Sequence, residues 1–197
     1  MENCLKTVNN CLDIFTSCIP KDTNNSNNST AVNNPNNNSS YKLPKMSYYT
    51  LHLPTRPKVD DEIRIKAKLK ERPKEFIINL CVDSALKPDD DEAAMIAFHF
   101  RTKFKGHPND RSYVVLNCKR GLNGWDEIEE IENSWIDDDA EEIEISLKFA
   151  KREIQFISGE SVEYQFEHQY EIQRIDRLQI GGDLDYIEEV ALRYRKK

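Results

Sequence analysis

Residues 63–70 read Ile63-Arg64-Ile65-Lys66-Ala67-Lys68-Leu69-Lys70. Apolar and cationic side chains alternate through this stretch with a period of two. Successive side chains of a β-strand point to opposite faces of a sheet, so the pattern predicts a strand with one face on a core and the other in solvent. A helix would instead place its apolar residues three or four positions apart.

The same alternation recurs at three further places between residues 76 and 167. Turn-forming sequences rich in Gly, Pro, Asn and Asp separate these segments, and no long helical pattern interrupts them. A series of short strands of this kind predicts an all-β fold, an antiparallel sandwich or barrel. The apolar positions of the three segments are Phe76, Ile78, Leu80 and Val82; Ile143, Ile145, Leu147 and Phe149; and Val162, Tyr164 and Phe166.

The 197-residue chain divides by composition into three parts. Residues 46–197 carry the strand pattern and are long enough for a single core. Residues 21–45 are rich in Asn and Ser, and this composition predicts a disordered linker. Residues 1–20 predict a short amphipathic helix, which is either a marginal element or a small oligomerisation or membrane-touching element. Its repeating residues are Cys4, Cys11 and Cys18, with Leu5, Leu12 and Ile19.

The overall charge and the cysteines limit the classes of function. Lys and Arg number 28 and Asp and Glu number 35, a net charge of −7, which disfavours a nucleic-acid partner. No apolar run is long enough to span a bilayer, and we identify no signal peptide. Five cysteines without a signal favour reduced thiols in the cytoplasm. We find no metal-ligand spacing, no cofactor motif and no nucleophile–base arrangement.

The strand pattern around residue 100 predicts that a group of polar residues lies on one face. His99, Arg101 and Lys103 lie two positions apart and therefore share one face of a strand, with Phe98 and Phe100 on the other. Asn117 occupies the polar face of the next strand, and Trp125 follows a Gly-containing turn. Charged and planar side chains read sugar hydroxyls, and an aromatic ring packs on the apolar face of a pyranose. The alternative is an ordinary solvated sheet face with one semi-buried Trp.

These segments resemble, in order, motifs of the galectin family. The resemblance implies a jelly-roll, concanavalin A-like sandwich and a lectin that binds β-galactosides, with His99, Asn117 and Trp125 at sugar-contact positions. The site segments are His99-Phe100-Arg101-Thr102-Lys103, Val115-Leu116-Asn117 and Trp125-Asp126-Glu127-Ile128-Glu129-Glu130. The framework segments are Phe76-Ile77-Ile78-Asn79-Leu80, Phe166-Glu167-His168-Gln169 and Leu178-Gln179-Ile180-Gly181-Gly182-Asp183-Leu184.

Five positions depart from the family pattern. Arg101 replaces an Asn, Lys103 replaces an Arg, and Asp126 replaces a Gly. Ile128 replaces a Glu that bonds sugar hydroxyls, and Glu130 replaces an Arg. The departures predict weak or altered β-galactoside binding, because unpaired hydroxyls and lost donors reduce affinity. The candidate carbohydrate-binding residues are His99, Arg101, Lys103, Asn117, Trp125, Glu127 and Glu130.

The sequence leaves several functions open. The first is a lectin for weakly bound β-galactosides or for charged glycans, since Arg101 and Lys103 add positive charge. The second is a galectin-fold module that binds protein partners and no sugar. A jelly-roll glycoside hydrolase is a remote third, based on the acidic run 126–130. We expect no enzyme activity, glycan or glycoprotein partners, a homo-oligomer as one option, and a cytoplasmic protein with non-classical export as an option.

Overall fold

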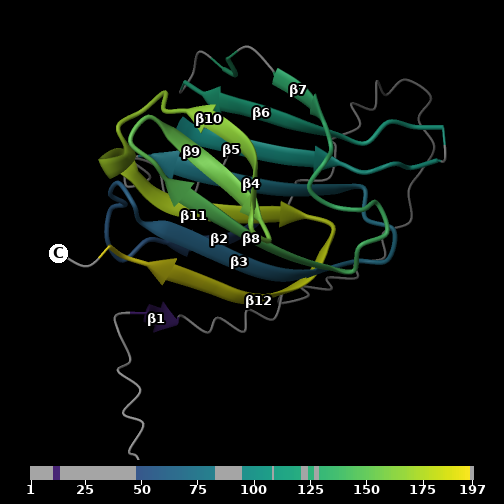
Figure 1. Ribbon diagram of the computed structural model, residues 1–197, viewed down its shortest axis with the longest axis horizontal. Coiled ribbons are helices and arrows are strands. Elements are labelled where there is room, and N and C mark those ends of the chain that lie inside the picture. Colours follow the sequence, from purple (N-terminus) through teal and green to yellow (C-terminus); the bar gives the residue numbers. More distant parts are fainter. Residues whose placement is uncertain are drawn as a thin grey trace, which may run out of the picture.

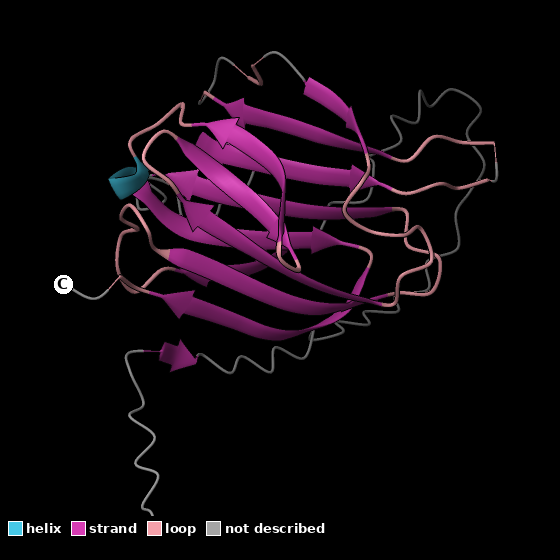
Figure 2. Ribbon diagram, viewed as in Figure 1, coloured by secondary structure: helices cyan, strands magenta, loops and turns pink. Residues whose placement is uncertain are grey.

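The computed structural model describes residues 11–13, 48–82, 95–107, 109–120, 124–126 and 129–195. Two sheets, each with antiparallel pairing throughout, pack face to face (Figure 1). This arrangement confirms the predicted all-β sandwich. A single turn of 3-10 helix, η3 (Ile172–Arg174), lies at one end of the sandwich (Figure 2). No helix in the described part of the chain has the length and apolar character needed to cross a bilayer.

Within the described residues each sheet contains six strands. The first sheet has the spatial order β1 (Cys11–Asp13), β12 (Leu184–Arg193), β3 (Glu62–Leu69), β8 (Glu142–Phe149), β9 (Glu153–Ser158) and β10 (Ser161–Glu167). The second sheet has the order β2 (Tyr48–His52), β11 (Ile175–Gly182), β4 (Glu75–Val82), β5 (Met95–Lys103), β6 (Tyr113–Lys119) and β7 (Glu129–Glu132).

The N-terminal part differs from the sequence prediction where the structure describes it. Strand β1 lies within residues 1–20, for which the sequence predicts a helix. Its backbone is extended and pairs antiparallel with β12, with Cys11 opposite Arg193 and Asp13 opposite Ala191. Edge pairing supplies backbone hydrogen bonds that a short isolated helix lacks. The rest of residues 1–20 and the linker predicted for residues 21–45 lie outside the described residues.

The predicted alternation of faces holds on β3 and fails on β4. Along β3 every second side chain is buried, and the outward-facing Arg64 and Lys66 both pair with Glu144 of β8, at 2.8 and 3.3 Å. On β4 both faces are buried from Phe76 to Val82. The polar Asn79, expected on a wet face, is 3% exposed. The polar face of the second sheet is therefore largely buried along β4.

Aromatic rings fill the core between the sheets. The ring of Phe100 on β5 stacks on Phe156 of β9, with centroids 4.1 Å apart and planes 11° apart. Trp135 packs edge-on against both rings, and its Nε1 donates to Oγ1 of Thr102 at 2.9 Å. These contacts fix the inner face of β5. Its intervening residues, including His99, must then point to the opposite face.

Candidate functional site

A row of polar side chains crosses the second sheet from strand to strand. Gln179 on β11 lies opposite Asn79 on β4, Asn79 lies opposite His99 on β5, and His99 lies opposite Asn117 on β6. Directly paired residues of antiparallel strands share a face. The structure therefore brings His99 and Asn117 together, as the alternation of their strands predicts.

Hydrogen bonds along this row orient the His99 ring. Nδ2 of Asn79 donates to Oε1 of Gln179 at 3.3 Å, which leaves Oδ1 of Asn79 as an acceptor. That oxygen lies 2.7 Å from Nδ1 of His99, so Nδ1 carries the proton and donates. In this tautomer Nε2 keeps its lone pair. His99 thus offers an acceptor, and a sugar hydroxyl is a matching donor.

His99 is neutral at physiological pH. It is only 9% exposed, and burial lowers its pKa from 6.5 to about 4. The positive charge of Arg101 acts in the same direction, and the negative charge of Glu75 opposes it. A neutral imidazole retains the Nε2 acceptor over the whole physiological range.

Trp125 stands beside His99 with much of its surface in solvent. Its ring centroid is 4.7 Å from that of His99, with the planes tilted by 57°. Nζ of Lys119 lies 5.9 Å from the indole centroid, within range of a cation–π contact. Trp125 is 48% exposed, whereas buried Trp135 serves the core. An exposed indole next to a neutral imidazole presents an apolar surface and a polar atom side by side, which suits a pyranose ring.

Both polar atoms of the Asn117 amide form hydrogen bonds with nearby backbone atoms. Oδ1 accepts from the backbone N–H of Cys118 at 2.6 Å, and Nδ2 donates to the carbonyl oxygen of Asp126 at 3.2 Å. The side chain is 3% exposed. Asn117 therefore holds the backbone next to Trp125, at Asp126, and its capacity to bond a sugar is smaller than the sequence resemblance implies.

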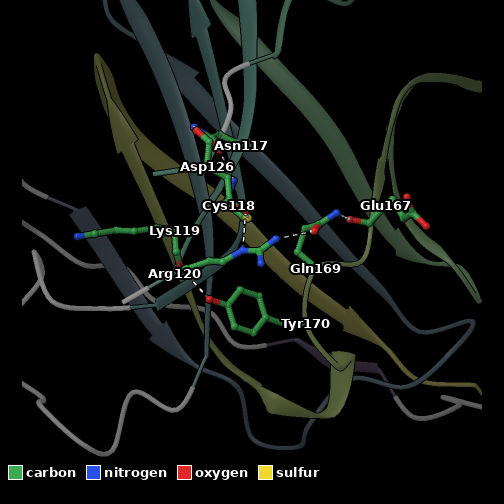
Figure 3. Close-up of polar contacts among 8 residues, drawn as sticks. All are labelled: Asn117, Cys118, Lys119, Arg120, Asp126, Glu167, Gln169 and Tyr170. Carbon is green, nitrogen blue, oxygen red and sulfur yellow. Dashed lines mark hydrogen bonds and ion pairs between the residues drawn. The ribbon is translucent and has the colours of Figure 1, made fainter. Parts of the chain in front are cut away.

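A second set of polar contacts joins Asp126 to Cys118 and Arg120, and Arg120 to Gln169 (Figure 3). The Asp126 carboxylate accepts from Nε of Arg120 at 2.6 Å and from Sγ of Cys118 at 2.9 Å. Arg120 also donates to Gln169, at 3.1 Å. Cys118 lies on the core side of β6, so the Asp126 carboxylate is turned away from His99. The added carboxylate ties Asp126 to Cys118 and Arg120.

Ionisation in this set follows from the same contacts. The hydrogen bond from Cys118, and the bond and charge of Arg120, lower the pKa of Asp126, although burial opposes them. Burial raises the pKa of the Cys118 thiol to about 11, and the hydrogen bond to Asp126 acts in the same direction. The carboxylate is therefore charged and the thiol protonated at neutral pH. The Cys118 thiol is not set up as a nucleophile.

Arg101 and Lys103 share a partner on the neighbouring strand. Nε of Arg101 donates to Oε2 of Glu75 at 3.0 Å, and Nζ of Lys103 pairs with the same oxygen. Burial alone would raise the pKa of Glu75, but hydrogen bonds from Lys103 and Arg101, together with their charges, lower it below its usual value. One carboxylate thus offsets part of the positive charge that the sequence alone assigns to this face.

The remaining candidate residues lie toward the edge strand or beyond the described chain. Glu130 on β7 is exposed and lies opposite Val115, which in turn lies opposite Arg101. It shares the polar face, about 9–10 Å from Arg101 across two strand spacings. Glu127 lies outside the described residues. Among the residues described, no group of three or more His, Cys, Asp and Glu side chains is placed to hold a metal ion.

Three important residues escape the sequence reasoning. Glu75 alternates with the apolar Phe76 and so belongs on the polar face, a signal that could have identified it. Asn79 and Gln179 lie inside two segments that resemble the galectin framework, and the sequence analysis assigns them no part in the site. Their relation to His99 depends on strand order, which the sequence pattern does not state.

Comparisons with known proteins agree with this geometry. The family model described as galactoside-binding lectin matches residues 48–192. No match was found among curated proteins. Two similar solved structures are the galectin LEC-6 of Caenorhabditis elegans and sheep galectin-11, the latter in complex with glycerol.

The two structures share the fold at low sequence identity. LEC-6 is 14% identical with a TM-score of 0.59, over 75% of this chain and 91% of LEC-6. Galectin-11 is 18% identical with a TM-score of 0.54, over 75% of this chain and 99% of galectin-11. With the family match across most of the chain and the sandwich architecture, these findings confirm the resemblance: the chain belongs to the galactoside-binding lectin family, the galectins.

Proposed function

We propose that this chain is a lectin that binds β-galactosides weakly, with recognition centred on His99 and Trp125. The observation that carries the proposal is the half-exposed indole 4.7 Å from an imidazole whose Nε2 is held as an acceptor. Membership of the lectin family supports a glycan as the ligand.

The strength of binding follows from a balance of terms. The indole contact contributes on the order of 1 kcal/mol beyond area burial, and one hydrogen bond to His99 contributes about 0.5–1.5 kcal/mol. Association itself costs several kcal/mol. Asn117 is engaged internally, and Glu75 already occupies Arg101 and Lys103. We therefore expect lactose to bind in the millimolar range, without enzymatic turnover.

Titration calorimetry with lactose tests the proposal directly. We expect weak binding by the wild type and none by Trp125→Ala or His99→Ala. Val162→Ala is the matched control, since Val162 is an exposed apolar residue on β10, in the other sheet, and its loss should leave binding unchanged. Lactose binding that survives both site substitutions in folded protein would reject this location. Silence across a glycan array would favour the alternative of a protein-binding module.

A gain-of-function variant tests the origin of the weakness. The double substitution Ile128→Glu with Glu130→Arg restores the family residues at both positions, so we expect tighter lactose binding. A folded double variant with unchanged affinity would show that other features, such as the engaged Asn117 amide, limit binding.

A further inference from the structure

Asp126 attaches the backbone beside Trp125 to β6 with both its main chain and its side chain. Its N–H donates to the carbonyl oxygen of Cys118 at 3.1 Å, and its own carbonyl oxygen accepts from Nδ2 of Asn117 at 3.2 Å. Any residue other than proline can form these two backbone contacts, whereas the side-chain contacts require an acceptor oxygen. The contribution that depends on the identity of residue 126 is therefore the carboxylate.

The carboxylate is held mainly by Arg120. Oδ2 of Asp126 accepts from Nε of Arg120 at 2.6 Å and from Sγ of Cys118 at 2.9 Å (Figure 3). A thiol is a weak donor, whereas a guanidinium and a carboxylate form a charge-assisted hydrogen bond. Arg120 also donates to Oε1 of Gln169, which follows β10 of the first sheet. Asp126 is thus connected through Arg120 to a part of the chain outside the sheet that carries His99.

The indole of Trp125 depends on its backbone for a fixed position. The side chain is 48% exposed, and the ring contacts His99, with centroids 4.7 Å apart, and Nζ of Lys119 at 5.9 Å. The backbone of Trp125 pairs with Lys119 through one isolated bridge. A side chain that becomes ordered only when its ligand binds weakens that binding. An anchor on the residue next to Trp125 therefore favours binding of a sugar to the ring.

Asp126 acts from the side of the backbone opposite to the sugar. At the bridge to Lys119, successive side chains point to opposite faces, so the Trp125 ring and the Asp126 carboxylate diverge. The ring meets His99, whereas the carboxylate meets the buried Cys118. A galactoside at His99 and Trp125 does not reach this carboxylate. An effect of Asp126 on sugar binding must therefore pass through Trp125.

We propose that Asp126 is a positioning residue of the galactoside site, and that its carboxylate, bound to Arg120, holds the Trp125 indole beside His99 in the orientation that receives a sugar. This inference rests on the proposed galactoside site for its ligand. The galectin motif has Gly at the position of Asp126, and a glycine has no side chain to form these contacts. The anchor is therefore a feature of this chain and compensates in part for its other departures from the motif.

Fluorine NMR observes the two tryptophans of the chain separately. Protein labelled with 5-fluorotryptophan gives one signal for each indole, and Trp125→Phe assigns them. Trp135 is buried and donates to Thr102, so its signal is the internal reference. We expect Asp126→Ala and Arg120→Gln to shift or broaden the Trp125 signal and to leave the Trp135 signal unchanged. Equal changes at both tryptophans would indicate a general loosening of the fold and would reject the proposal.

Lactose titration of the same proteins measures the effect on binding. Asp126→Ala and Arg120→Gln should each weaken lactose binding by about three- to tenfold, the cost of ordering one free side chain. Asp126→Asn keeps an acceptor oxygen without the charge and should retain part of the affinity. The double variant Asp126→Ala with Arg120→Gln should bind no more weakly than the weaker single variant, because both changes remove the same contact. Arg195→Gln, which breaks an exposed pair with Asp60, is the matched control and should change neither signal nor affinity.

The outcomes separate this inference from the proposed function. Positioning by Asp126 is rejected if Asp126→Ala leaves lactose affinity unchanged, if affinity falls while the Trp125 signal stays the same, or if the losses add in the double variant. If the wild type binds no lactose, the galactoside site fails, and the fluorine signals then decide. A change confined to Trp125 would retain Asp126 as the anchor of the indole, and an unchanged Trp125 signal would remove it.

Discussion

Nδ1 of His99 lies 2.7 Å from Oδ1 of Asn79, and this one contact fixes which nitrogen of the imidazole faces a ligand as an acceptor. The relation explains how a buried histidine can still serve recognition. It also identifies Asn79 as a positioning residue, which acts on a ligand only through His99.

Substitution of Asn79 separates its positioning role from a purely structural one. Asn79→Ala removes a buried acceptor, so we expect a stability loss of about 1–3 kcal/mol and loss of lactose binding. Asn79→Asp keeps an acceptor for Nδ1–H, so binding at neutral pH should persist, while the added carboxylate raises the pKa of His99. NMR of the His99 ring nitrogens reports the tautomer. Loss of binding in both variants with an unchanged tautomer would contradict this role.

Glu75→Gln tests the ion pairs on the polar face. The substitution removes the carboxylate shared by Arg101 and Lys103. We expect stability to fall by about 1.5–3 kcal/mol, the range for hydrogen bonds to charged groups, and affinity for sulfated lactose to rise as the two cations are released. Glu71→Gln, at an exposed turn nearby, is the control. Unchanged stability and anion affinity would mean that the pairs contribute nothing measurable.

The low pKa of His99 predicts a defined pH dependence of stability. The folded-state pKa of about 4 lies below the ordinary value of 6.5, so the unfolded chain binds a proton that the folded chain does not. Stability should therefore fall as pH drops from about 6.5 toward 4, by up to about 3 kcal/mol. Denaturant unfolding between pH 4.5 and 6.5 measures the slope, which should be shallower in His99→Gln. Parallel curves for the two proteins would refute the assignment.

Gly182 permits the close approach of β11 to Glu75. Its φ is +99°, and a Cβ there would lie 2.3 Å from the carbonyl oxygen of Glu75. That same oxygen accepts from the N–H of Asp183 at 2.8 Å. Gly182→Ala should be severely destabilising, because backbone atoms must move, whereas Gly159→Ala has a positive φ but open space and should cost only about 1 kcal/mol. Equal melting temperatures for the two variants would show that this approach is easily relaxed.

Truncation tests the contribution of the N-terminal part. A chain that begins at Met46 retains both sheets except β1, which pairs through three residues with the edge of β12. We expect it to keep a cooperative thermal transition, with a change in any oligomeric mass measured by light scattering. Failure of this shorter chain to fold would show that the N-terminal part belongs to the structural unit.

The sequence alone determines much of the fold because it records which face each strand residue occupies. The alternation in residues 63–70 separates core from surface, and burial along β3 follows it residue by residue. Around His99 the alternation assigns side chains to opposite faces, but both faces are buried there. The same rule places Arg101, Lys103 and Asn117 on one face. Period two is a local property of the extended chain, so a single sequence is sufficient to reveal it.

Only the tertiary structure decides which residues become neighbours across the sheet. Asn79 meets His99 across 20 positions and Gln179 across 100, and these pairings depend on strand order and register. The burial of Arg177 likewise has no signal in the local sequence pattern. Sequence periodicity fixes the face of a side chain, but the long-range hydrogen bonding of the sheets fixes its partner, and the partner sets its charge, tautomer and capacity to bind.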